Sequence, residues 1–139
     1  MRTTIRKSLT TMATALALSA GGAAIDSGTA QASANAISTM ASVRTSHCAG
    51  YLRGSYGDGQ DYAQATFTVL NGAYNCLGWL ERSTNGGRSW SVVSAIHWMA
   101  VGDTPYTTWY WDGPGYLARS CISESVAAPL QSAHCSSSW

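Results

Sequence analysis

The sequence has few charged residues and almost no lysine, which limits the partners that it can bind. Charged residues make up 11% of the 139-residue chain, and Lys7 is its single lysine. Beyond residue 32 there are five arginines and six carboxylates, a formal net charge of −1. Nucleic acids and anionic membranes select for clusters of lysine and arginine. We therefore expect no nucleic acid and no membrane surface as a partner.

A long uninterrupted hydrophobic run is also missing. The apolar stretch at 9–25 is interrupted by Thr, Ser and Gly, whereas a membrane span needs about 20 strongly apolar residues, so we expect no stable membrane insertion. The stretch follows three basic residues and precedes Ala30-Gln31-Ala32, with a second cleavage option after Ala34. This layout is typical of a secretory signal peptide. We predict a signal peptide at 1–32, cleaved after Ala32 or Ala34, and a secreted, extracellular protein.

Familiar catalytic and metal-binding motifs are absent as well. The sequence contains no Gly-x-Ser-x-Gly elbow and no His-x-x-x-His zinc pair. Asp58 and Asp61 flank a turn, but they supply too few of the six to eight oxygens that calcium needs. A small secreted hydrolase that uses Glu81, Glu124 or a histidine stays open as an alternative. We expect no catalytic residue, no cofactor and no metal.

The cysteines indicate two disulfides. Cys48, Cys76, Cys121 and Cys135 are spaced by 28, 45 and 14 residues, which does not fit the closely spaced cysteine pairs of a zinc site. An even number of cysteines in a short exported chain is typical of disulfides, and four cysteines allow three pairings. We favour Cys121–Cys135, because the segment between them looks like a hairpin with its turn at 127–129. Cys48–Cys76 would follow.

Short runs rich in Tyr, Trp, Val and Thr alternate with turn residues from position 47 onward, which predicts an all-β domain. In the run at 61–70, the apolar residues at 63, 65, 67 and 69 alternate with the polar residues at 64, 66 and 68, as in a strand with one buried face. We predict a small antiparallel β-sandwich of about seven strands at 47–139, with a flexible N-terminal tail or a short surface helix at 33–46. The expected strands are 48–56, 61–70, 74–82, 88–96, 105–111, 116–122 and 131–137.

Aromatic residues supply the candidate binding site. The chain has six tryptophans and seven tyrosines but a single phenylalanine. The expected strand at 105–111 reads PYTTWYW. Alternation places Trp109 and Trp111 on one face and Tyr106 and Tyr110 on the other. One face must turn inward, and the other would offer aromatic rings to a ligand. That both faces are covered is the alternative.

A short segment at 83–90 resembles a known structural hairpin. Ser83, Asn85, Gly87, Ser89 and Trp90 are spaced as in the Asp-box of sialidases and related β-propellers, with Asn in place of the usual Asp. The resemblance implies a hairpin in which the polar side chain caps backbone amides and the aromatic packs beneath it, remote from any active site. Asn-Gly at 85–86 is also a strong turn signal on its own.

Two further resemblances concern the whole domain. The segments at 101–103 and 116–121 look like the end of tendamistat-type α-amylase inhibitors, which are exported β-sandwiches with two disulfides. That resemblance implies a Cys76–Cys121 bridge and leaves Cys48–Cys135. The Trp-Arg-Tyr triplet of those inhibitors does not occur in this sequence. The runs GWLERSTNGGRSW and YWDGPGYLARSC resemble small exported actinobacterial β-sandwich proteins of unassigned function.

The sequence as a whole favours a secreted, monomeric, non-enzymatic binding protein. Its partner would be an extracellular protein, as for an inhibitor of an extracellular enzyme, or a glycan. A carbohydrate- or cell-envelope-binding module is the first alternative, and the small hydrolase is the second. The binding residues would be the aromatic side chains of 105–111.

Overall fold

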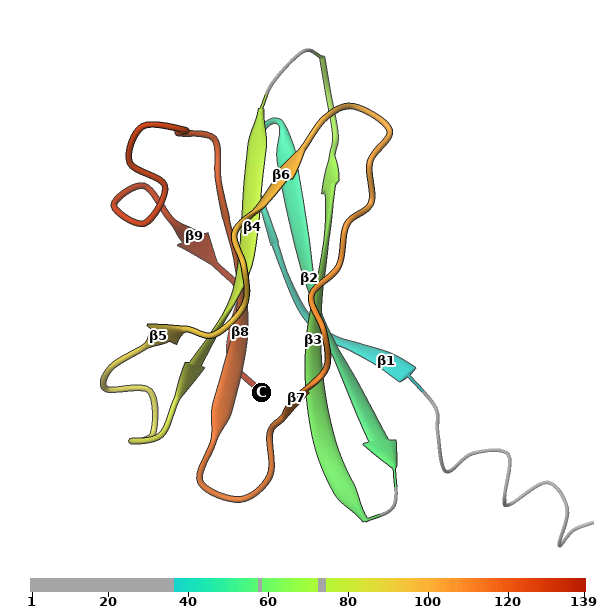
Figure 1. The fold of residues 1–139 in the computed structure, drawn as a ribbon, viewed down its shortest axis with the longest axis vertical. Coiled ribbons are helices and arrows are strands. Elements are labelled where there is room, and N and C mark those ends of the chain that lie inside the picture. The colour runs from blue at the N-terminus through green and yellow to red at the C-terminus, as the bar shows by residue number, and fades with distance from the viewer. Residues whose placement is uncertain (1–36, 58, 73–74) are drawn as a thin grey trace, which may run out of the picture. The chain divides into compact units, whose positions relative to one another are not determined.

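Two antiparallel β-sheets face each other in the computed structural model, which describes residues 37–57, 59–72 and 75–139 (Figure 1). There is no helix in these residues. The predicted all-β, disulfide-bonded antiparallel sandwich is therefore confirmed. The predicted signal peptide at 1–32 lies outside the described residues.

Sheet A contains the strands in the order β1-β2-β3-β7. Its centre is a long hairpin in which the two middle strands pair from Cys48↔Val69 to Gly57↔Gln60. In β3 apolar and polar side chains alternate from Ala63 to Val69. This alternation favours the observed register, because a slip by one residue would expose the apolar face. The bounds are β1 (Ile37–Arg44), β2 (Cys48–Gly57), β3 (Gln60–Val69) and β7 (Tyr110–Trp111).

Sheet B contains the strands in the order β5-β4-β8-β9, and β6 also pairs with β4. Its centre is the pairing of β4 with β8, from Leu77↔Ser123 to Ser83↔Leu117. Both faces of β4 are buried, since Leu80 points into the sandwich and Trp79 is covered on the opposite face. The bounds are β4 (Cys76–Ser83), β5 (Ser91–Val92), β6 (His97–Met99), β8 (Leu117–Ser123) and β9 (His134–Cys135).

The expectation of a flexible tail or a short surface helix at 33–46 is wrong for residues 37–44, which form strand β1. Residues 37–44 pair antiparallel with β2 along its length, with one irregularity between Thr39 and Ala41. β1 is an edge strand whose side chains are mostly exposed. Only Ala41 and Val43 pack against the core. Such a strand needs little apolar alternation, so its Ala/Ser/Thr-rich sequence carries no clear strand pattern.

The long central strands match their predicted ranges, whereas three predictions are wrong in length. The segments 88–96, 105–111 and 131–137 contribute strands of only two residues each, β5, β7 and β9, and β6 was not predicted. These segments run along sheet edges, where isolated hydrogen bonds replace a continuous ladder. For example, the Phe67 amide donates to the Pro105 carbonyl at 3.0 Å.

The core lies between the two sheets and is closely fitted. Phe67 of β3 lies against Gly78 of β4, where an added Cβ would stand 2.5 Å from the phenylalanine ring. Glycine at this position lets the ring approach the opposite sheet. The other buried core residues are Cys48, Leu52, Ala63, Ala65, Cys76, Leu80, Met99, Ala118 and Ile122.

The disulfides are Cys48–Cys76 and Cys121–Cys135, which confirms the favoured pairing. The first joins β2 of sheet A to β4 of sheet B, and the second links directly opposed residues of β8 and β9. The Cys76–Cys121 bridge implied by the inhibitor resemblance is wrong. Cys121 pairs with Trp79 on the outer face of sheet B, whereas Cys76 belongs to the core between the sheets. Side chains on opposite faces of one sheet cannot be bridged.

Structural disulfides form and persist in oxidising compartments. Within the described part of the chain, no helix has the length and hydrophobicity of a membrane span.

Candidate functional site

Three of the four predicted binding residues are exposed. Tyr106, Trp109 and Trp111 are exposed by 65%, 36% and 38% respectively. Tyr110 instead packs against the core, opposite Ala63 of β3. The prediction that Tyr106 and Tyr110 share a face is therefore wrong. Tyr106 is paired with Thr66 on the outer face of sheet A, away from the core.

Thr107 causes this change of face. Its amide donates to the Ala65 carbonyl at 2.9 Å, and its Oγ1 accepts from the Ala65 amide at 3.1 Å. In a regular strand this acceptor would be a backbone carbonyl, but here it is a side-chain oxygen. The register therefore shifts by one residue between the Tyr106–Thr66 pair and the Tyr110–Ala63 pair. Gln64 also binds Thr107, because its Nε2 donates to the Thr107 carbonyl at 2.9 Å. Both side chains are buried, so the irregular segment is firmly anchored.

Trp109 borders a hollow on the outer face of sheet A. The hollow has a volume of about 260 Å³ and is lined by Trp109, Tyr62, Ser55 and Gly57. Ser55 and Tyr62 lie directly opposite each other in the β2–β3 hairpin. Gly57 has no side chain to fill the space beside them. We call Tyr62, Tyr106 and Trp109 together the aromatic surface.

Tyr62 is the part of this surface that sequence reasoning missed. It has the same parity along β3 as Gln64 and Thr66, which the alternation at 61–70 had already placed on the polar face. A tyrosine on a polar strand face was the available signal. Trp111 is paired directly opposite Tyr62 but does not line the hollow, and its ring is in edge-to-face contact with Tyr116 at 5.0 Å between ring centroids.

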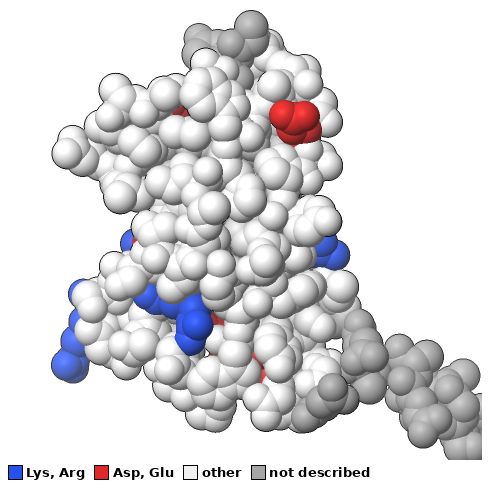
Figure 2. All heavy atoms as spheres, in the orientation of Figure 1, with Lys and Arg blue, Asp and Glu red and all other residues white. Residues whose placement is uncertain are grey.

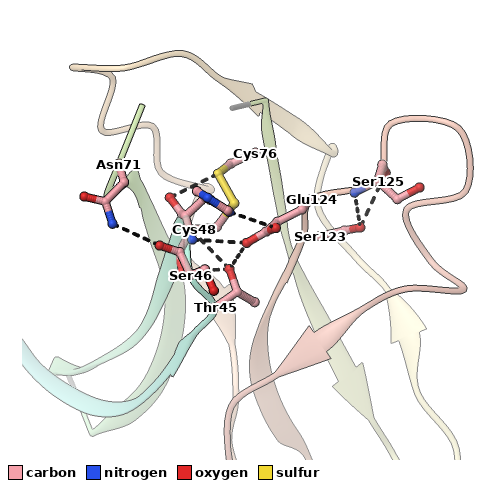
Figure 3. Close-up of polar contacts among 9 residues, drawn as sticks. Thr45, Ser46, Cys48, Asn71, Cys76, Ser123, Glu124 and Ser125 are labelled. Atoms are coloured by element: carbon pink, nitrogen blue, oxygen red, sulfur yellow. Dashed lines mark hydrogen bonds and ion pairs between the residues drawn. A yellow bond between two sulfur atoms is a disulfide. The ribbon is translucent and has the colours of Figure 1, made fainter. Parts of the chain in front are cut away.

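A polar cluster connects the β1–β2 turn to the end of β8 (Figure 3). Glu124 accepts hydrogen bonds from the Thr45 hydroxyl, from the His47 amide at 3.1 Å and, on its other oxygen, from the His47 ring at 3.1 Å. The Thr45 hydrogen bond, followed by those from His47, lowers the pKa of Glu124. The cluster borders a polar hollow of about 570 Å³ that also reaches Arg44 and His134. Since both carboxylate oxygens are taken, Glu124 serves first as a link between strands.

Glu81 is held in a second polar cluster, on the outer face of sheet B. Trp79 Nε1 donates to one of its oxygens at 2.9 Å. Arg119 donates to the other oxygen through Nε at 2.9 Å and Nη2 at 2.6 Å. The Arg119 guanidinium also lies 4.1 Å from the centroid of the Trp90 ring. Cys121 and Cys135 lie near Glu81, but their sulfurs form a disulfide and offer no thiolate to a metal.

The structure does not bring Glu81 and Glu124 together. Glu81 is paired with Arg119, and Glu124 follows five residues later along the chain of β8. Five strand residues correspond to roughly 16 Å, which exceeds the ~10 Å within which glycosidase carboxylates act as a pair.

Asp112 and Arg82 form a buried and incompletely satisfied pair. Asp112 Oδ1 lies 4.0 Å from Arg82 Nε, and neither atom has a hydrogen-bond partner among the described residues. Burial raises the pKa of Asp112 to about 6, although the Arg82 charge acts in the opposite direction. Arg82 also lies over the Tyr116 ring, 4.1 Å from its centroid.

The segment at 83–90 forms a turn closed by its own side chains. Ser83 Oγ accepts from the Gly87 amide at 2.9 Å, and Asn85 Oδ1 accepts from the Ser89 amide at 3.0 Å. Gly86 and Gly87 have φ angles of 70° and 84°, which favour glycine. The turn therefore acts as a folding element between β4 and β5.

Comparison with protein-family models, curated proteins and solved structures finds no match. The class that the fold itself defines is a small β-sandwich with one disulfide between its sheets and one within sheet B.

Proposed function

We propose that this chain is an exported, non-enzymatic binding protein and that the aromatic surface is its ligand site. The observation that carries the proposal is the exposure of Tyr106 and Trp109, with Trp109 and Tyr62 lining one hollow on the outer face of sheet A. Exposed aromatic side chains that cluster on a surface are the usual anchors of protein and ligand interfaces.

The anchoring of the surface supports a binding role. The hydrogen bonds of Thr107 hold the backbone before Trp109, and the pairing of Tyr110 and Trp111 with β3 holds it after Trp109. A preformed site loses less conformational entropy when it binds than a mobile loop does. The long β2–β3 hairpin beneath it adds a stiff platform.

The hydrogen bonds that Glu81 and Glu124 make within the domain support a non-enzymatic role. Glu81 is bonded to Trp79 and Arg119, and Glu124 is bonded to Thr45 and His47. These groups contribute to the sandwich itself. Neither glutamate lines the hollow beside Trp109.

Export is supported by the signal-peptide pattern at 1–32 and by the two disulfides. An extracellular macromolecule is therefore the expected class of ligand. A secreted enzyme that this chain inhibits belongs to that class, as does a glycan of an extracellular surface.

A capture experiment tests the proposal. The immobilised mature domain should retain a ligand from culture medium, and the double variant Tyr106→Ser/Trp109→Ser should lose it. Trp98→Ser is the matched control, because Trp98 is exposed by 55% but lies on β6 of sheet B. Equal retention by the double variant and the wild type would contradict the proposed site.

A further inference from the structure

We infer that the ligand of the aromatic surface is a neutral glycan, with one sugar ring stacked on Trp109 and Tyr62. This inference rests on the proposed function and names its ligand class. It is carried by the size of the hollow, by the polar groups of the residues that line it and by the sparse charge on the outer face of β2 and β3.

The hollow fits a group of the size of one ring. Its volume of about 260 Å³ is slightly below the ~300–1,000 Å³ of sites that enclose a drug-sized molecule. Two aromatic residues, Tyr62 and Trp109, form its wall. The C–H groups on the face of a pyranose carry a small positive charge, and the face of an aromatic ring is negative. A sugar ring can therefore stack there without needing a deep pocket.

Three residues that line the hollow carry hydrogen-bonding groups. These groups are the hydroxyls of Ser55 and Tyr62 and the indole N–H of Trp109. Among the described residues none of these three groups takes part in a hydrogen bond. Hydroxyls both donate and accept, and the indole N–H donates. This set complements the hydroxyls of a sugar.

Charge on this face is too sparse to select an ionic ligand. Of the β2 and β3 side chains on the outer face, only Arg53 is charged, and its Nη1 donates to Gln64 Oε1 at 3.4 Å. In the view of Figure 2, most of the visible surface of the domain is formed by uncharged residues, in line with the 11% of charged residues in the chain. An anionic polysaccharide would need a cluster of basic groups, so a neutral one is the better complement.

Tyr106 extends the surface beyond a single sugar. It is paired with Thr66, four residues along β3 from Tyr62, and is 65% exposed. Four strand residues span roughly 13 Å, so a second ring of the same chain can reach it. The expected ligand is therefore an oligosaccharide or polysaccharide.

Affinity electrophoresis tests this inference. The mature domain is run through gels that contain xylan, β-glucan, mannan or, as an anionic control, polygalacturonate. We expect at least one neutral polysaccharide to retard the wild type. Trp109→Ala should weaken binding at least about tenfold, and Tyr106→Ala should weaken it less. Trp98→Ala should migrate as the wild type does.

The outcomes separate this inference from the proposed function. Retardation by neutral polysaccharides that is lost in Trp109→Ala, with an unchanged thermal melt, supports both. If no neutral polysaccharide binds, or only the anionic one does, the inference fails. If capture from culture medium then yields a protein ligand that depends on Tyr106 and Trp109, the proposed binding function is supported and the glycan inference alone is rejected.

Discussion

At the scale of single residues, the least satisfied point of the fold is the pair of Asp112 and Arg82. Asp112 Oδ1 and Arg82 Nε lie 4.0 Å apart, and neither atom has a hydrogen-bond partner in the described part of the chain. A buried carboxylate in this position is costly to ionise. The raised pKa of Asp112 therefore has a consequence for stability.

Asp112 should make the domain less stable as the pH rises from 4 to 7. The pKa of Asp112 is about 6 in the folded protein, against an ordinary value of 3.8. Between these values the folded state binds more protons than the unfolded state, so the free energy of unfolding falls as pH increases. Asp112→Asn cannot titrate. The free energy of unfolding of the variant minus that of the wild type should therefore rise by on the order of 2 kcal/mol from pH 4 to pH 7.

Urea denaturation at both pH values measures this difference. Comparing the two proteins removes the contribution of Glu124, whose lowered pKa acts in the opposite direction. A difference between wild type and variant that does not change with pH would show that Asp112 keeps its ordinary pKa.

Glu81 is a buried acid whose loss should lower the stability of the domain. It is only 8% exposed and binds both Trp79 and Arg119. Glu81→Gln weakens the two Arg119 hydrogen bonds and leaves the guanidinium without a counter-charge. We expect a loss of about 2 kcal/mol in the free energy of unfolding. Arg88→Gln, at an exposed position, should change it by less than about 0.5 kcal/mol. Equal effects of the two substitutions would contradict the described cluster.

At the scale of elements, the two disulfides differ in accessibility. Cys48 and Cys76 are both fully buried between the sheets, whereas Cys135 is partly exposed at the edge strand β9. Reductants attack a disulfide only where a thiolate can reach a sulfur. The edge disulfide should therefore open first.

Limited reduction under native conditions should label Cys121 and Cys135 before Cys48 and Cys76. Alkylation followed by peptide mass spectrometry gives the order. Earlier labelling of the Cys48–Cys76 pair would mean that the two sheets separate more easily than β9 leaves its neighbour.

The contact between β3 and β4 depends on Gly78. A methyl group there would overlap the Phe67 ring, so Gly78→Ala should lower the free energy of unfolding by about 1–3 kcal/mol. Phe67→Leu removes the ring and should relieve the overlap. The double variant should thus be more stable than the sum of the two single effects predicts. Additive effects in thermal or urea unfolding would contradict the close fit.

The elements also show what the sequence could and could not predict. The β2–β3 hairpin follows from alternation in 61–70, because one face is buried and the other is not. Strand β1 was missed because its exposed side chains are free of that requirement. The faces of Tyr106 and Tyr110 were assigned wrongly because the Thr107 hydroxyl takes a ladder position, and no periodic pattern reports such a substitution. Tyr62 was missed because it lies in a different segment from the aromatic run.

At the scale of the whole domain, the two sheets and the disulfide between them form a scaffold for one exposed face. The polar clusters around Glu124 and Glu81 lie at the β1–β2 turn and on sheet B, and both stabilise connections between strands. The aromatic surface has no such internal task, since Tyr106 and Trp109 remain open to solvent. The polar groups thus bind one another within the domain, whereas the aromatic rings are exposed to solvent. This difference is the basis of the proposed binding function.

Nuclear magnetic resonance of the indole N–H groups tests that claim most directly. Residues 33–139 contain all six tryptophans of the chain, and single Trp→Phe variants of this segment assign their signals. On addition of the macromolecular fraction of culture medium, the signal of Trp109 should shift or broaden, while that of Trp98 should stay unchanged. Six unchanged signals, or a response confined to Trp98, would contradict the account.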